Sequence, residues 1–200
     1  MARTQAADYE LRREAIMEKS AELFAELGFN GVSVGQLAVA CGISKALLYH
    51  YYESKEAILY EVMASHIELL QEDLAAVLSV KATSLARLRS LVRRFMQHYV
   101  GAVNSQKVLL NELGCLPAEK RVVIVAKQRD LIGAVQSLLS DIHPPLAKDP
   151  GRARVETMLL FGMINWTHTW FDPAGALTAD EVADMVLERI EKPLTLPDGH

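Results

Sequence analysis

Cysteine is scarce in this chain, and the usual metal-binding and disulfide patterns are missing with it. The 200 residues include two cysteines, Cys41 and Cys115, without a C-x-x-C pair or any other metal-ligand spacing. Lone cysteines in apolar, helix-forming surroundings are usually small buried side chains rather than partners in a disulfide or a redox switch. We therefore expect no metal site, and the composition is compatible with a reducing compartment.

Long apolar runs are absent too. The longest uninterrupted stretches are of the kind found at residues 122–126, far short of the roughly 20 apolar residues that span a bilayer. No charged segment followed by an apolar one opens the chain, so nothing resembles a secretory leader. The sequence predicts a cytoplasmic protein that does not associate with membranes.

Sequence patterns of catalysis are missing as well. There is no glycine-rich phosphate loop, no nucleophile elbow, no His-x-x-x-His pair among the six histidines and no pair of carboxylates in an apolar stretch. The sequence therefore argues against an enzyme. We expect neither catalytic residues nor a bound cofactor.

Aromatic residues make up 6% of the chain, and the Val, Ile and Thr alternation typical of strands is rare. Hydrophobic residues, at 50%, recur instead at helical spacing. This periodicity predicts an all-α protein of about nine helices with short polar or Pro/Gly-rich breaks. The expected helices are residues 9–27, a short one from 34, then 45–52, 55–78, 85–103, 106–113, 117–139, 152–171 and 178–190.

Two short capped helices around a glycine stand out in the first third of the chain. Ser33, with Gln36 three residues later, has the capping-box spacing, which predicts a helix start at Val34. Gly42 suits the left-handed turn that ends this helix, and Ser44 can cap the next one. The pattern is typical of a helix-turn-helix.

The second of these helices turns Leu48 and Tyr52 inward, one turn apart. Its other face carries a cation, a phenol, an imidazole and a small residue, which suits the major groove of DNA. A further helix start at Lys55 offers N–H groups and an ammonium group to a phosphate. The candidate DNA-binding residues are Ser33, Ser44, Lys45, Ala46, Tyr49, His50, Tyr51 and Lys55.

The charge of this region is weak for a DNA-binding protein. Residues 1–55 hold six Lys or Arg and seven acids. Four of the acids, at positions 14, 18, 22 and 26, follow one solvated stripe at four-residue spacing. We expect modest non-specific affinity and a reliance on two linked copies.

Over roughly residues 10 to 60, the sequence resembles the TetR family of bacterial repressors. The matching pattern is a capped helix with alanine, a glycine turn, a serine, then Leu-Tyr-His-Tyr and Ser-Lys-Glu. Leu47 departs from it, since the family commonly has Thr or Ser there, and an apolar contact replaces a hydroxyl contact to phosphate. The resemblance implies a helix-turn-helix DNA-binding domain at 1–55 and a ligand-binding and dimerisation domain at 56–200. The alternative is a small helical subdomain that binds no nucleic acid.

The segment 152–171 places large apolar side chains on several sides of a helix, too many for a single core-facing stripe. The following helix, 178–190, is amphipathic. Paired with their symmetry copies, these two helices would form a four-helix interface, the arrangement that TetR-like proteins use, so we expect a homodimer. The alternative is that both helices cover the core of the monomer.

The most distinctive part of the second half is Asn-Trp-Thr-His-Thr-Trp-Phe-Asp-Pro, residues 165–173. Its two tryptophans, one turn apart, are expected on the same face of a helix, either in packing or in a ligand tunnel. Together with residues 109–113 and 128–130, the segment resembles the TetR subgroup that senses acyl-CoA thioesters and controls degradation pathways. The resemblance implies an acyl-CoA effector.

An apolar slot with a few polar anchors would suit such a ligand, with basic side chains at its mouth for phosphates. The candidate ligand-binding residues are Phe95, Met96, Tyr99, Leu109, Leu113, Arg129, Phe161, Asn165, Trp166 and Trp170.

The sequence thus predicts a ligand-responsive bacterial repressor that binds a palindromic double-stranded DNA operator as a dimer. Its small-molecule effector would be a CoA thioester of a degradation pathway, from an aromatic acid such as phenylacetate, a fatty acid or a steroid. The alternative is a TetR-type repressor of an efflux or drug-response gene with a hydrophobic drug effector. Glu112 is then the obvious acidic pocket residue.

Overall fold

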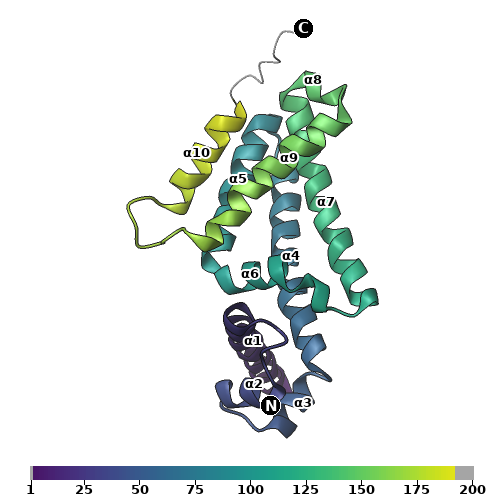
Figure 1. Ribbon diagram of the computed structural model, residues 1–200, viewed down its shortest axis with the longest axis vertical. Helices are drawn as coiled ribbons and strands as arrows, with labels where there is room; N and C mark the ends of the chain where they lie inside the picture. Colours follow the sequence, from purple (N-terminus) through teal and green to yellow (C-terminus); the bar gives the residue numbers. More distant parts are fainter. Residues whose placement is uncertain (1, 192–200) are drawn as a thin grey trace. The chain divides into compact units, whose positions relative to one another are not determined.

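The computed structural model describes residues 2–191, with side chains from residue 8 onward. Every regular element in this range is helical (Figure 1). This confirms the predicted all-α class. The elements are α1 (Ala2–Leu27), α2 (Val34–Ala40), α3 (Lys45–Tyr51), α4 (Lys55–Ser79), α5 (Ser84–Gly101), α6 (Val103–Asn111), η1 (Leu113–Cys115), α7 (Ala118–Ile142), α8 (Pro144–Ala147), α9 (Pro150–Asn165), η2 (Trp166–Thr169) and α10 (Ala179–Glu191).

The residues fall into two compact units that interleave along the sequence. The first contains the chain up to Leu69 together with Ala102–Ala126, and the second contains Leu70–Gly101 and the chain from Lys127 onward. Both α4 and α7 therefore run from one unit into the other. These two units differ from the predicted functional domains, whose boundary after residue 55 stays a prediction.

The helix-turn-helix of the first unit has the predicted caps. The Ser33 hydroxyl accepts from the Gln36 amide, and the Gln36 side chain accepts from the Ser33 amide, which closes the capping box of α2. Gly42 adopts a φ of +65° and Ser44 caps α3. Gly28, with a φ of +73°, ends α1 as expected. These positions are set by local chemistry, because each satisfies an end group of a helix or supplies a left-handed backbone.

Polar contacts hold the helices of the first unit together around an apolar core. Arg13 of α1 forms an ion pair of 2.5 Å with Glu61 of α4, and the Tyr52 hydroxyl donates to the Arg13 carbonyl. Burial raises the pKa of Tyr52 to about 12. Farther along α4, the buried His66 Nε2 lies 2.7 Å from Oε1 of Gln106 in α6. The helix α6 also packs along α1.

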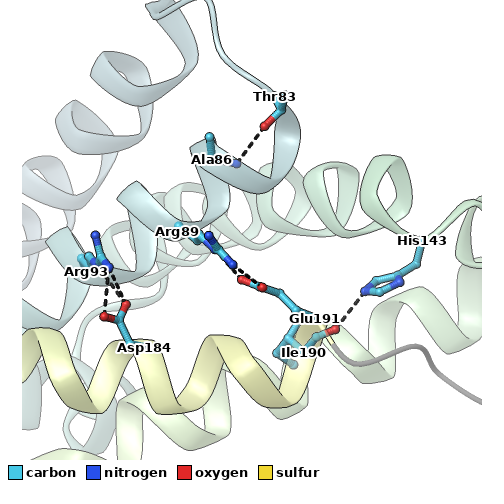
Figure 2. Close-up of polar contacts among 8 residues, drawn as sticks. All are labelled: Thr83, Ala86, Arg89, Arg93, His143, Asp184, Ile190 and Glu191. Atoms are coloured by element: carbon cyan, nitrogen blue, oxygen red, sulfur yellow. Dashed lines mark hydrogen bonds and ion pairs between the residues drawn. The ribbon is translucent and has the colours of Figure 1, made fainter.

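In the second unit, α10 packs along α5 through an apolar seam. Figure 2 shows the polar contacts between these two helices. Arg89 pairs with Glu191 through two hydrogen bonds, and Arg93 pairs with Asp184 through two more of 2.8 and 2.9 Å. His143 Nε2 lies 2.9 Å from the Ile190 carbonyl at the end of α10. The seam itself buries Leu88, Leu91, Phe95, Val182, Ala183, Val186, Leu187 and Ile190.

Two predicted helix bounds are wrong, whereas the other ends lie within three residues of expectation. The helix α1 already begins at Ala2 instead of residue 9. The helix α9, expected at residues 152–171, ends at Asn165 instead of Phe171, and a short 3-10 helix follows. At this end, Thr167 donates to the Ile164 carbonyl at 2.6 Å and Thr169 donates to the Trp166 carbonyl at 2.7 Å. Such bonds compete with the helical ladder. A further helix, α8, was not predicted.

Candidate nucleic-acid interface and effector site

The helix α3 has the predicted amphipathic arrangement. Leu48 and Tyr52 are buried, with exposed fractions of 1% and 4%. Lys45, Ala46, Tyr49 and His50 are exposed on the other side, and Tyr51 is half-buried. The N-cap serines Ser33 and Ser44 are exposed at the first turns of α2 and α3. The helix therefore presents a polar and aromatic face of the size and chemistry that can read base edges in a major groove.

The side chain of Lys55 lies differently from the expected phosphate contact. Its Nζ donates to the Phe29 carbonyl at 2.8 Å and to the Val32 carbonyl at 2.7 Å. The ammonium group also lies 4.0 Å from the centroid of the Phe29 ring. Two of its three protons are thus used inside the unit. Lys55 fastens the first turn of α4 to the loop between α1 and α2.

That loop needs glycine at Gly31, because a Cβ there would meet the Leu27 carbonyl oxygen at 2.4 Å. The chain thus turns tightly enough to aim the Phe29 and Val32 carbonyls toward the same ammonium group. This contact could not be predicted from residue types, since backbone carbonyls carry no residue-type pattern.

The aromatic side of α3 contacts α1 through a residue that was not among the predicted site residues. The Tyr9 ring lies 4.7 Å from the Tyr51 ring and 6.3 Å from the His50 ring, measured between centroids. One turn farther along α1, the Arg13 guanidinium lies 5.4 Å from the centroid of the Tyr52 ring. A separation of about forty residues hides such contacts from any sequence periodicity.

Four of the predicted ligand-binding residues meet in the second unit. Phe95, Met96 and Tyr99 of α5 and Phe161 of α9 are all buried there. The Phe95 ring lies stacked against Tyr99 at 6.2 Å and against Phe161 at 6.4 Å. Asn165, the last residue of α9, is half-buried. These side chains form an apolar and aromatic cluster in the interior of the second unit.

Of the remaining predicted ligand residues, two belong to the first unit and three are exposed. Leu109 and Leu113 belong to the first unit, and Arg129 is exposed on α7. Trp166 and Trp170 are exposed by 64% and 57%, and their rings contact His168 and Phe171, respectively. The expectation of one α-helical face with both tryptophans is wrong, because α9 has ended before them.

Both tryptophans instead border a surface groove of about 620 Å³ between α9 and α10. Its other apolar side chains are Met158, Leu159, Met163, Leu177, Val182, Met185 and Val186. Several of them are exposed by more than 40%, which leaves a continuous apolar surface on the second unit.

None of the described helices is long and apolar enough to cross a bilayer. The cysteines are both half-buried thiols, and burial raises the pKa of each. Cys115 lies beside Glu112, whose Oε2 is 3.5 Å from the sulfur.

Both halves of the chain match models of known protein families. Residues 16–62 match the family model for bacterial regulatory proteins of the tetR family, and residues 81–192 match the model for the C-terminal domain of Tetracyclin repressor-like proteins. The second match alone covers more than half of the chain. The chain belongs to the TetR family of bacterial transcriptional regulators. Members of this family are DNA-binding regulators rather than enzymes, in line with the sequence-based expectation.

Solved structures and curated relatives agree with this assignment. A TetR-family regulator from Bordetella parapertussis is 36% identical, with 94% of this chain and 98% of that one covered at a TM-score of 0.88. AibR, solved in complex with isovaleryl coenzyme A and operator DNA, is 29% identical, with 91% and 99% covered at a TM-score of 0.79. The transcriptional repressor KstR2 of Rhodococcus jostii is 25% identical, with 93% and 92% covered.

The placement of Lys55 generates a first prediction. Lys55→Met should lower the free energy of unfolding by about 2 to 3 kcal/mol, because two backbone carbonyls lose a charged donor. Thermal unfolding of the full chain measures this loss. Lys45→Met is the matched control, since this exposed lysine of α3 should leave the melting temperature unchanged. If Lys55 instead served as a phosphate contact, its replacement would leave stability intact and reduce the salt dependence of DNA binding by one charge.

Proposed function

We propose that this TetR-family regulator is a repressor that binds a palindromic operator as a homodimer and is released by a CoA thioester. The observation that carries DNA binding is the exposed face of α3, with Lys45, Tyr49 and His50 at groove-reading positions. The short helix is capped at its first turn and anchored by Leu48 and Tyr52. A second copy would supply the other half-site, because a two-fold symmetric protein matches a palindrome.

The proposed operator binding assigns testable roles to residues on the exposed face of α3. Selection on random duplexes should enrich a palindromic site, and its affinity should fall as salt rises. Lys45→Ala or His50→Ala should cost about 1 to 3 kcal/mol of binding and blur discrimination between bases. Competition binding on the selected site and on single-base variants measures both effects. Should the selection enrich no sequence at all, the protein is not an operator-binding repressor.

The apolar surface of α9 and α10 is the proposed dimer interface. Met158, Leu159 and Met185 are exposed by 45%, 56% and 42%, and the two tryptophans extend the same surface. The inner side of α10 already packs on α5, so its outer side remains for a partner. Two such helix pairs related by a two-fold axis would bury each other's apolar faces as a four-helix interface.

A charge in this surface should therefore separate the subunits. Met158→Glu would place an unpaired carboxylate in the interface and should give monomers at micromolar concentration, as measured by sedimentation. Val122→Glu is the matched control, because this valine of α7 is 66% exposed and lies outside the groove. Leu187→Glu would test folding rather than assembly, since Leu187 is 2% exposed within the α5–α10 seam. A monomeric wild type would contradict the proposed interface.

The effector class rests on two supports. The buried cluster of Phe95, Met96, Tyr99 and Phe161 supplies an apolar environment for an acyl group. AibR, which resembles this chain over 91% of its length, was solved with a CoA thioester and operator DNA. Ligand binding in the second unit can reach the first through α4, which contributes residues to both. A thioester that favours the DNA-free form by about 3 kcal/mol weakens operator binding about a hundredfold.

A thermal-shift panel tests this class directly. Phenylacetyl-, isovaleryl- and octanoyl-CoA are compared with their free acids and with free CoA, and each stabilising compound is then tested for operator release. Phe161→Leu should reduce the shift, because it alters the buried cluster, whereas Trp166→Ala on the exposed groove should retain it. Stabilisation by hydrophobic drugs alone would favour the drug-responsive alternative. A panel in which no thioester stabilises the protein or displaces DNA would refute the proposed effector.

A further inference from the structure

Three aromatic rings from two helices meet at the recognition helix. Tyr9 of α1 lies against Tyr51 of α3 with a centroid distance of 4.7 Å and an interplanar angle of 31°. The His50 ring stands edge-on to both, at 6.3 Å and 85° from Tyr9 and at 5.6 Å and 81° from Tyr51. We call these three residues the aromatic triad.

The aromatic triad includes a side chain whose conformation before binding matters for DNA recognition. His50 is exposed on the face of α3 that the proposed function assigns to base reading. An exposed side chain samples several rotamers, and fixing one of them on binding DNA costs conformational entropy. Edge-to-face contact with an aromatic ring favours one orientation, because the positive ring edge meets the negative face of its neighbour.

The helix α1 is held in register with α3 at two adjacent positions. Tyr9 meets Tyr51 and His50, and Arg13, four residues later on the same side of α1, meets the Tyr52 ring and the Glu61 carboxylate. Tyr9 is half-buried, and its ring contacts with Tyr51 and His50 restrict the orientations that its ring can adopt. The early start of α1, at Ala2, places Tyr9 within a regular helix two turns from its end.

We propose that Tyr9 is a positioning residue for DNA recognition, which orders His50 and Tyr51 before the protein meets its operator. This inference rests on the proposed operator binding. Tyr9 acts through its neighbours, so its contribution is a preformed reading face instead of a contact to a base. The ring is the required part, since the hydroxyl makes none of the three ring contacts.

Operator binding by two variants and a control tests this role. Tyr9→Ala should weaken affinity for the selected operator about five- to tenfold and flatten its preference at the bases that His50→Ala affects. Tyr9→Phe keeps the ring and should remain close to wild type. Leu11→Ala is the matched control on α1, because Leu11 is 64% exposed. An equal loss in Tyr9→Phe, or a loss with unchanged base preference, would overturn the positioning role.

A double-mutant cycle separates positioning from general destabilisation. If Tyr9 acts through His50, then His50→Ala should cost less in the Tyr9→Ala background than in the wild-type background. Additive losses of affinity would show that the two residues act independently, and the proposal would fail.

A measurement without DNA tests the geometry itself. In the free protein, ring currents from Tyr9 should shift the imidazole proton resonances of His50, which the His50→Ala spectrum identifies. Tyr9→Ala should return these resonances toward their exposed positions, and Tyr9→Phe should keep them shifted. A wild type that binds no operator would overturn the proposed function and the positioning role together. A shift that survives Tyr9→Ala would overturn the triad alone.

Discussion

The recognition helix α3 is seven residues long, and a helix of that length has no stability of its own in water. Its conformation therefore depends on what surrounds it. The Ser44 cap fixes its start, Leu48 and Tyr52 are buried beneath it, and Arg13 and Tyr9 of α1 hold its aromatic side. The first unit can be understood as the framework that makes one short helix rigid. Rigidity on the inner face is what allows the outer face to carry exposed polar groups at defined positions.

The helix α4 supports this framework from one side and enters the second unit at its other end. In the first unit, Glu61 pairs with Arg13, and His66 pairs with Gln106. In the second unit, the buried Asp73 carboxylate pairs with Arg94 and His98 of α5. Polar contacts of this kind are directional, so each one fixes the rotation and the axial position of α4 within its unit. A ligand that rearranged α5 would therefore act on Asp73, which lies on the same continuous helix as Lys55 and Glu61.

The helix-turn-helix could be predicted because its helix caps and left-handed glycines depend on residues at most four positions away in the sequence. Ser33, Gly42 and Ser44 adopt the predicted conformations, and the inward face of α3 follows from its period. Contacts distant in sequence could not be predicted in this way. Lys55 meets carbonyls 26 and 23 residues away, and Arg89 meets Glu191 across 102 residues. The tryptophans were misplaced for a local reason instead, since the chain changes from an α-helix to a 3-10 helix at Trp166, where Thr167 and Thr169 donate to nearby carbonyls.

These contacts also explain how a region with more acids than bases can serve as a DNA-binding head. Arg13 is paired with Glu61, Lys19 with Glu22, and Lys55 with two carbonyls. Among the described side chains of residues 8–55, this leaves Arg12 and Lys45 outside such contacts. Because residues 1–55 carry more acids than bases, we expect phosphate attraction to supply a smaller share of the binding free energy than in a strongly basic domain. In the proposed dimer, the balance would come from contacts to base edges and from the second copy of the head. Arg13 and Lys55 hold the elements around α3 in place, so the proposed specificity depends on how precisely they and the core position its exposed face.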